Sequence, residues 1–142
     1  MNTTNKQPRI GDIFIMNFTG VGSEQSGWRP GLVFQNNVGN AYSPNIIALP
    51  LTSSVKKVNQ PTHVVLYASQ TGLYKDSMVL CENPERVSKE RIGDYITTLS
   101  DEDMQKVASA SLLAMSAISF IDPNQLIHLW RRASDLNKRT IA

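Results

Sequence analysis

Metal-binding and disulfide-forming residues are scarce in this 142-residue chain, which has one cysteine, Cys81, and two histidines, His63 and His128. A single cysteine excludes an intrachain disulfide and a four-cysteine zinc site, and it suits a reducing cytoplasm. The three residues show none of the paired spacings that zinc sites use. We therefore expect no metal and a cytoplasmic location. We interpret His63, in a β-branched run, as structural, and Cys81, in an apolar run, as an inert thiol.

Motifs for nucleotide cofactors and for serine hydrolases are also missing. The chain has no GxGxxG or GxxxxGK[ST] segment to hold phosphates, and no GxSxG segment to carry a nucleophilic serine. Its most apolar region, residues 108–121, is interrupted by four serines and is too short to span a bilayer. These absences argue against a bound cofactor, a serine hydrolase and a membrane protein.

The composition suits one globular domain. A hydrophobic share of 41% is enough for a core and argues against global disorder. The 14 basic and 12 acidic residues leave a net charge of +2, which does not by itself indicate a nucleic-acid-binding protein. A basic groove would have to come from the fold.

Short β-branched and aromatic runs, bounded by turn residues, predict strands over most of the first hundred residues. The expected strands are residues 11–18, 30–35, 46–51, 62–66, 77–82 and 95–99. Both faces of the first strand are largely apolar, which predicts that it is covered on both sides. Turns are expected at 38–45 and 68–75, and one helical turn at 88–92. Strands this short and closely spaced are well buried as a small antiparallel β-barrel.

The hydrophobic period changes near residue 100 from that of strands to that of helices. Ser100 and Asp103 form a capping box. Apolar residues follow at helical spacing: Met104, Val107, Ala108, Leu112, Met115 and Ile118. We expect this stripe to pack on the barrel, with its methionines as core filler. Asp122 and Pro123 predict the start of a second helix.

The stretch Gly20–Asn37, GVGSEQSGWRPGLVFQNN, joins a glycine-rich polar loop to an apolar strand. Arg29 stands between them, directly before Pro30, which biases the backbone of Arg29 towards an extended conformation. This predicts that Arg29 lies at a loop–strand junction, with its planar donor fork directed into whatever the loop encloses. That fork matches phosphate. On the local pattern alone, a solvated arginine at a sheet edge is the simpler interpretation.

Several segments resemble, in the same order, the motifs of the MazF/PemK family of toxin endoribonucleases. They are GSEQSGWRPGLVFQNNVGN followed by YSP, then ALPLTSS, QPTHV and KDSMVLCEN. The resemblance covers Arg9 to about Met115, and it is specific because separate motifs recur in register. It implies an α+β fold, with an SH3-like or CcdB-like antiparallel barrel and a helix over residues 9–121. We expect a disordered tail at 1–8 and an additional C-terminal helix at 122–142.

The resemblance implies the toxin of a type II toxin–antitoxin system, a sequence-specific, metal-independent endoribonuclease that cleaves single-stranded RNA. Arg29 and Thr52 are the implied catalytic residues, since arginine can neutralise the phosphorane and threonine can donate to a phosphoryl oxygen. The 2′-OH of the RNA would attack, leaving a 2′,3′-cyclic phosphate and a 5′-OH. Threonine is no strong base near neutral pH, and arginine stays charged. The group that accepts the 2′-OH proton is therefore open.

Single-stranded RNA is recognised by hydrogen bonding to its bases and by stacking on them. The candidate RNA-binding residues are Glu24, Gln25, Trp28, Asn36, Ser53, Glu82 and Asn83. Trp28 either stacks on a base or packs the loop. Relatives often have Asp at the position of Asn37 and Gln at that of Asn83, and both differences bear on base preference.

The same resemblance implies a homodimer and a cognate antitoxin that lays an extended acidic segment in the RNA groove. DNA would be bound only indirectly, through the antitoxin complex. Two alternatives stay open: a CcdB-like toxin that binds DNA gyrase with the same barrel, and an inactive binding module. Arg29 and Thr52 argue against the first, whereas the differences at Asn37 and Asn83 leave room for the second.

The second helix, within residues 122–142, extends beyond the usual family length and has an apolar and a basic side. One hypothesis, which we prefer, is that it covers an apolar surface of the barrel or of a dimer through Trp130, because tryptophan is usually buried. The other is that its cations widen a basic RNA track. Those cations are Arg131, Arg132, Lys138 and Arg139.

Overall fold

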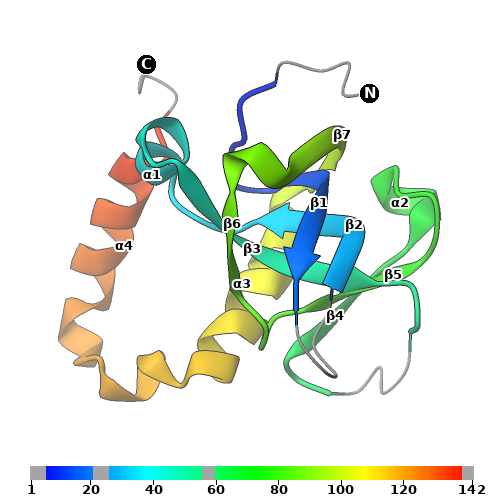
Figure 1. The fold of residues 1–142 in the computed structure, drawn as a ribbon. Coiled ribbons are helices and arrows are strands. Elements are labelled where there is room, and N and C mark those ends of the chain that lie inside the picture. The colour runs from blue at the N-terminus through cyan, green and yellow to red at the C-terminus, as the bar shows by residue number, and fades with distance from the viewer. Residues whose placement is uncertain (1–5, 21–25, 56–59, 139–142) are drawn as a thin grey trace.

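The computed structural model describes residues 6–20, 26–55 and 60–138 (Figure 1). Within these ranges the strands form one antiparallel sheet, flanked by α-helices and 3-10 turns. The strands are β1 (Asp12–Thr19), β2 (Ser26–Val33), β3 (Asn45–Thr52), β4 (His63–Leu66), β5 (Ser77–Leu80), β6 (Glu85–Ser88) and β7 (Ile92–Thr98). The helices are α1 (Asn37–Tyr42), α2 (Ala68–Thr71), α3 (Asp101–Met115) and α4 (Leu126–Leu136). The 3-10 turns are η1 (Lys89–Arg91), η2 (Ala117–Phe120) and η3 (Pro123–Gln125).

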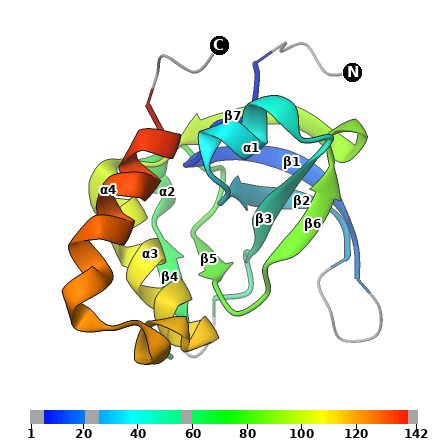
Figure 2. The ribbon, with the colours of Figure 1, turned by 90° about the vertical axis from the view of Figure 1, so that its left-hand side faces the viewer.

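Strand β3 is central to the sheet because it pairs with three other strands. Its residues 45–48 pair with β6, residues 48–50 with β2, and residues 51–52 with β5. The strand order is β4-β5-β3-β2-β1-β7, with β6 attached to β3. Among the described residues no ladder joins β4 to β7, so the sheet is curved but open (Figure 2). The predicted α+β fold class, an antiparallel sheet with C-terminal helices, is confirmed, although the barrel is not closed.

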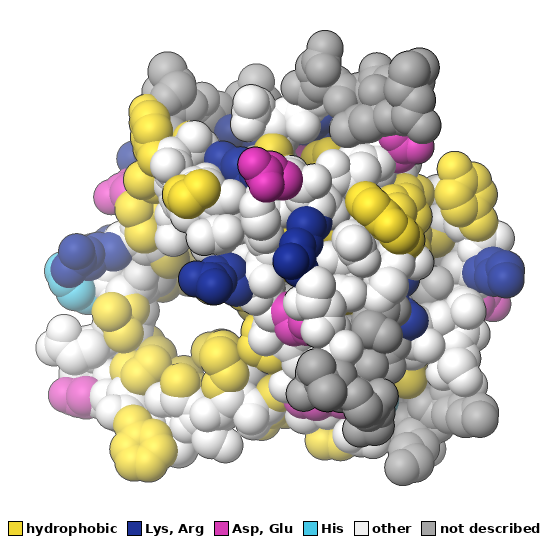
Figure 3. Space-filling view, in the orientation of Figure 1, with side chains coloured by type: hydrophobic (Ala, Val, Ile, Leu, Met, Phe, Trp, Pro, Cys, Tyr) yellow, Lys and Arg dark blue, Asp and Glu magenta, His cyan; other side chains and the backbone are white. Residues whose placement is uncertain are grey.

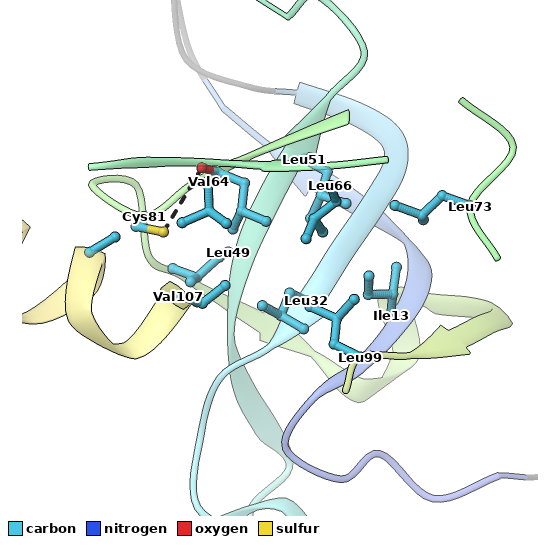
Figure 4. Close-up of a cluster of buried hydrophobic side chains, with 12 residues drawn as sticks. Ile13, Leu32, Leu49, Leu51, Val64, Leu66, Leu73, Cys81, Leu99 and Val107 are labelled. Carbon is cyan, nitrogen blue, oxygen red and sulfur yellow. Dashed lines mark hydrogen bonds between the residues drawn. The ribbon is translucent and has the colours of Figure 1, made fainter. Parts of the chain in front are cut away.

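Buried hydrophobic side chains form a cluster on each face of the sheet. Strand β1 contributes to both, because alternate residues of a strand point to opposite faces. Ile13 belongs to the cluster beneath α3, and Phe14 and Met16 belong to the other. Figure 4 shows the first cluster, where Val107 of α3 lies beside Leu49 of β3. The prediction that the first strand is covered on both sides is confirmed.

Residues 38–45 contain helix α1 instead of the predicted turn. The side chain of Asn36 caps this helix by accepting a hydrogen bond from the Gly39 N–H at 2.9 Å. Asn40 is buried inside the same corner, where its Nδ2 donates to the Gln35 carbonyl at 2.7 Å. The asparagines that suggested a turn therefore stabilise a short helix instead.

Strand β6 is absent from the sequence prediction. It has one buried side chain, Val87, which is too few for an alternating pattern, and it forms by pairing with β3. The predicted turn at 68–75 starts with the short helix α2, which ends at Gly72 in the left-handed conformation with φ 85°. The single helical turn expected at 88–92 is η1.

Helix α3 begins as predicted, with the Ser100 side chain accepting a hydrogen bond from the Asp103 N–H at 3.1 Å. The apolar residues of this helix, however, lie on two neighbouring faces, of which only one packs on the sheet. Met104 and Val107 pack on the sheet, whereas Met115 is 55% exposed. The prediction that the methionines all fill the core is therefore wrong for Met115, because it lies on a neighbouring face of the helix.

Helix α4 lies apart from the sheet, beyond the turns η2 and η3 (Figures 1 and 2). Asp122 caps η3 by accepting from the Asn124 N–H at 3.0 Å, and Pro123 opens that 3-10 turn. The predicted helix start is therefore a 3-10 turn, and α4 itself begins at Leu126. Trp130 is 64% exposed, so the prediction that it covers the barrel is wrong, while a role at a dimer surface stays a prediction. A bilayer-spanning helix would need a longer apolar stretch than any described helix provides.

Candidate active site

A pocket of about 490 Å³ lies where strands β1, β2, β3 and β7 meet the connection from α2 to β5. Its apolar wall consists of Ile15, Pro30, Leu51, Leu73 and Ile96, and its polar wall of Arg29, Thr52, Ser53, Tyr74, Lys75 and Ser77. The pocket thus brings together Arg29 and Thr52, the two residues assigned to catalysis from the sequence. The described part of the lining has two cations and no carboxylate, so its field favours an anion such as a phosphate.

Arg29 is positioned by the β1–β2 hairpin. It pairs with Met16 of β1, and the pairing continues from there to Ser26 opposite Thr19. Arg29 therefore lies inside β2, and the predicted loop–strand junction is wrong because the strand starts earlier than its apolar residues. Its half-buried side chain lines the pocket. A cation held on a paired strand is better fixed in position than one on a loop.

Thr52 is the last residue of β3 and pairs with Met78 of β5. Its Oγ1 accepts a hydrogen bond from the Ser54 N–H at 3.1 Å, which orients the hydroxyl at the strand end. A threonine hydroxyl has one proton to donate as well as two acceptor lone pairs. With Oγ1 accepting from Ser54, that proton can still be donated to an oxygen in the pocket. Ser53, the next residue, lines the same pocket.

Three polar residues of the pocket were missed by the sequence analysis: Tyr74, Lys75 and Ser77. Ser77 Oγ donates to the Lys75 carbonyl at 2.9 Å, which makes this corner compact. Tyr74 and Lys75 are exposed at its rim. Lys75 and Ser77 belong to the segment KDSMVLCEN, so the motif itself contained the signal that could have identified them.

Two hydrogen bonds hold the connection from α2 to β5 against the pocket. The Thr97 hydroxyl of β7 donates to the Thr71 carbonyl at 2.7 Å. The Asp76 carboxylate accepts from the Ala68 N–H at 2.8 Å and closes the turn. Because of these contacts, Lys75 lies in the same pocket as Arg29 although the two are distant in sequence.

The other candidate RNA-binding residues that the structure describes do not line this pocket. Trp28 is 61% exposed and lies near Gly93 of β7, where an added Cβ would be 3.3 Å from its ring. Asn36 caps α1, and Glu82 Oε2 lies 2.7 Å from His63 Nε2. Asn83 follows β5 and lies outside the pocket lining. Glu24 and Gln25 lie outside the described residues.

Cys81 is buried beneath α3, and burial raises the pKa of its thiol to about 11. It is therefore protonated near neutral pH, in line with its interpretation as inert. His63 Nε2 contacts Glu82, whereas its buried Nδ1 has no hydrogen-bond partner among the described residues, so its structural role stays a prediction. In the described part of the chain, no three His, Cys, Asp or Glu side chains gather in a group that could hold a metal ion.

The profile of the PemK-like, MazF-like toxins of type II toxin–antitoxin systems matches residues 9–114. The chain belongs to this family. The family resemblance seen in its motifs is thus confirmed. Endoribonuclease EndoA of Bacillus subtilis (strain 168) is 40% identical to this family member over 111 residues, which are 78% of this chain and 96% of EndoA.

Solved structures of the family share the fold. MazF (Form-I) from Deinococcus radiodurans superposes with a TM-score of 0.69 at 24% identity, covering 79% of this chain and 99% of that one. An endoribonuclease of a mycobacterial species, solved in complex with its cognate antitoxin, gives a TM-score of 0.64 at 25% identity, covering 78% and 96%. The family match to this MazF-like protein ends at residue 114, within α3, so α4 lies beyond it.

Proposed function

We propose that this MazF-like protein is the toxin of a type II toxin–antitoxin system and acts as an endoribonuclease on single-stranded RNA. The observation that carries the proposal is the shared pocket, which Arg29 enters from β2 and Thr52 from β3. The similarity to EndoA, a protein named as an endoribonuclease, extends over nearly the whole length of that protein and supports the same activity here.

The proposed reaction uses the 2′-OH of the RNA as its nucleophile. The 2′ oxygen attacks the adjacent phosphorus, the bond from phosphorus to the 5′ oxygen breaks, and the departing oxygen takes up a proton. The products are a 2′,3′-cyclic phosphate and a 5′-OH. Negative charge grows on the phosphoryl oxygens during this displacement. The guanidinium of Arg29 and the hydroxyl of Thr52 stabilise that charge, and Lys75 adds a second cation.

We propose that the reaction needs no metal ion. Metal-dependent nucleases use cations to stabilise the charge on the reacting phosphate, and in this pocket Arg29 and Lys75 can supply that positive charge. Among the described residues, the lining includes no carboxylate and no imidazole, so this part of the pocket provides no evident general base. The proton of the 2′-OH then leaves to solvent or to a group outside the described lining.

We further propose that a base next to the scissile phosphate lies at the rim of the pocket. Tyr74 is exposed there and offers an aromatic face, and Ser53 offers a hydroxyl. The candidates elsewhere on the chain would contact nucleotides further along the strand. This arrangement suits recognition of a short single-stranded sequence.

The partners proposed from the family are a cognate antitoxin and a second copy of the chain, in the cytoplasm. An acidic antitoxin segment would compete with RNA for the cations of the pocket. A CcdB-like gyrase-binding toxin would have no need for a guanidinium and a threonine hydroxyl in one phosphate-sized pocket. An inactive binding module would bind RNA without cutting it.

The test is to incubate the purified protein with a long single-stranded RNA in excess EDTA and to map the new 5′ ends. Cleavage at a recurring short sequence is expected, with 5′-OH and cyclic phosphate ends. A matched RNA that is 2′-deoxy only at the nucleotide 5′ to the cut should stay intact. If cleavage requires a divalent ion, or if the deoxy substrate is cut, the proposed chemistry is wrong.

A further inference from the structure

The connection from β4 to β5 exposes two tyrosine rings, one on each side of α2. Tyr67 directly precedes this helix and is 52% exposed, and Tyr74 follows it and is 87% exposed. An aromatic ring in water contributes little to folding, because its stabilising effect comes from the apolar area that it removes from water. The two rings therefore offer apolar, planar surface to a ligand.

The backbone beneath these rings is held by hydrogen bonds and by one buried side chain. Thr71 Oγ1 donates to the Tyr67 carbonyl at 2.9 Å, and the Thr97 hydroxyl of β7 donates to the Thr71 carbonyl at 2.7 Å. Leu73, the residue before Tyr74, is buried in the cluster beneath α3. Side chains on a fixed backbone lose less freedom when a ligand binds, so the connection suits a preformed binding surface.

Strand register places Tyr67 on the same face of the sheet as Thr52. Thr52 of β3 pairs with Met78 of β5, and Met78 pairs with Val65 of β4. Tyr67 lies two residues beyond Val65 with an extended backbone, φ −88° and ψ 132°, so the two side chains point to the same face. From the usual spacing of strands and residues, the Cα atoms of Thr52 and Tyr67 lie about 12 Å apart. One extended RNA strand can contact both residues with nucleotides that lie close together in its sequence.

The second ring belongs to the pocket itself. Tyr74 lines it together with Arg29 and Thr52. In Figure 3 a hydrophobic side chain projects from the surface in the region of α2, at the right, and a basic side chain lies below it. The segment from Tyr67 to Tyr74, YASQTGLY, has no charged residue. This surface therefore continues from the pocket without further charge, and it suits the bases of a nucleic acid better than its phosphates.

We propose, on the basis of the RNA cleavage proposed above, that Tyr67 and Tyr74 form an aromatic platform on which bases of the substrate stack. Tyr74 takes the base beside the scissile phosphate, and Tyr67 takes a base further along the same strand. Every base has a π face, so stacking adds affinity with little preference for sequence. The face of an aromatic ring is electrically negative and gives no attraction to the carboxylates of an acidic peptide. The platform is therefore a subsite for single-stranded RNA.

The first test measures RNA binding by full-length variants at position 67. The probe is a short single-stranded RNA that contains the mapped cleavage site and is 2′-deoxy at the nucleotide 5′ to the cut. In fluorescence anisotropy, Tyr67→Ala should raise the dissociation constant at least about fivefold, the effect of losing one stacked base. Tyr67→Phe keeps the ring and should stay within about twofold of the wild type. The salt dependence of binding should be the same in all three proteins, because stacking releases no counterions.

The matched control removes a tyrosine ring elsewhere. Tyr42 of α1 is 69% exposed and lies on the opposite side of the molecule from α2 (Figure 1). Tyr42→Ala should leave the dissociation constant unchanged. The melting temperature of Tyr67→Ala should match the wild type, because the hydrogen bonds that hold α2 use the backbone of residue 67 and not its side chain.

The second test identifies the stacked base. Probes with an abasic nucleotide at one position at a time are bound to the wild type and to Tyr67→Ala. At one position the wild type should lose affinity at least about fivefold, and Tyr67→Ala should show no loss at that position, because the ring and the base act as a pair. An effect of the variant on folding alone would leave the pattern of abasic losses unchanged, and that result overturns the platform.

Two further outcomes separate the platform from the proposed function. If the wild type binds and cuts RNA while Tyr67→Ala binds it as tightly, the platform is wrong and the endoribonuclease activity stands. Equal losses in Tyr67→Ala and Tyr67→Phe would show that the hydroxyl acts instead of the ring, and would overturn stacking. A wild type that neither binds nor cuts RNA overturns both proposals.

Discussion

The side chains of Met16 and Phe18 in β1 lie against Gly31 of β2, whose partner in the strand register is Phe14. A Cβ atom at position 31 would be 2.7 Å from Met16 Sδ and 2.7 Å from Phe18 Cζ, closer than such atoms can approach. Both neighbours are fully buried, so neither can move aside easily. Glycine is therefore needed for the close contact between the two strands, and Arg29 is held two residues away on the same strand.

The Gly31→Ala variant should lose about 1–3 kcal/mol in the free energy of unfolding, because its methyl group overpacks the cluster around Met16. Urea denaturation followed by tryptophan fluorescence measures this change. Cleavage should also fall, since β2 must shift and Arg29 shifts with it. An unchanged unfolding midpoint would show that the core has room at this position.

The Arg29→Ala variant should lose about 10²–10³ in cleavage rate, because one donor to the transition-state charge is removed. Its circular dichroism and melting temperature should match the wild type, since the side chain lines the pocket rather than the core. Arg29→Lys is the matched control: it keeps the charge without the planar fork and should recover only part of the rate. A variant with Ala at position 29 that cleaves at more than about a tenth of the wild-type rate contradicts the assignment.

Thr52 is tested by a pair of substitutions that separate its hydroxyl from its shape. Thr52→Val keeps the branched shape and removes the hydroxyl, so the rate should fall by about 10²-fold or more. Thr52→Ser keeps the hydroxyl and should stay within about tenfold of the wild type. Single-turnover cleavage measures both. Equal losses in the two variants would mean that the strand end, and not the hydroxyl, matters.

Local patterns were sufficient for the described strands other than β6, and for the side-chain caps at Ser100 and Asp122. The Ser100 and Asp122 caps form as predicted, because a cap depends on residues only a few positions apart. The motifs also led to Arg29 and Thr52, which lie in one pocket. That pairing came from the family resemblance, since no local pattern relates Arg29 of β2 to Thr52 of β3, although the two strands pair directly.

Contacts that depend on tertiary structure were missed. Lys75 reaches the pocket because Thr97 of β7 holds α2 in place, and no spacing in the sequence encodes that contact. The α3 stripe was read as one face, although only the part near Val107 packs on the sheet. Likewise the polar residues around Asn36 predicted a turn, whereas its side chain caps a helix. For Lys75 and for the α3 stripe, a distant partner decided between two locally acceptable structures, whereas at Asn36 the choice between turn and helix was local.

Lys75→Ala should weaken RNA binding and make it less dependent on salt. Each phosphate contact with single-stranded RNA contributes about 0.7 to the slope of log affinity against log salt concentration. Removing Lys75 should lower the slope by about this amount, whereas Lys75→Arg should preserve it. Lys106→Ala, an exposed cation on α3 away from the pocket, is the control and should leave the slope unchanged. Fluorescence anisotropy with a cleavage-resistant 2′-deoxy analogue measures all four proteins.

Cys81 should make the stability of the protein fall in alkaline solution. Burial raises the pKa of its thiol from 9.0 to about 11; the Ser111 hydroxyl acts to lower this pKa and the Glu82 carboxylate to raise it. The folded state therefore binds this proton more tightly than the unfolded state does. The corresponding stabilisation is complete below about pH 9 and is lost as the pH rises through about 11. Unfolding free energies of the wild type and of Cys81→Ala, measured from pH 7 to pH 10.5, should converge at the alkaline end. If the difference between them stays constant across that range, the thiol is not shielded from solvent.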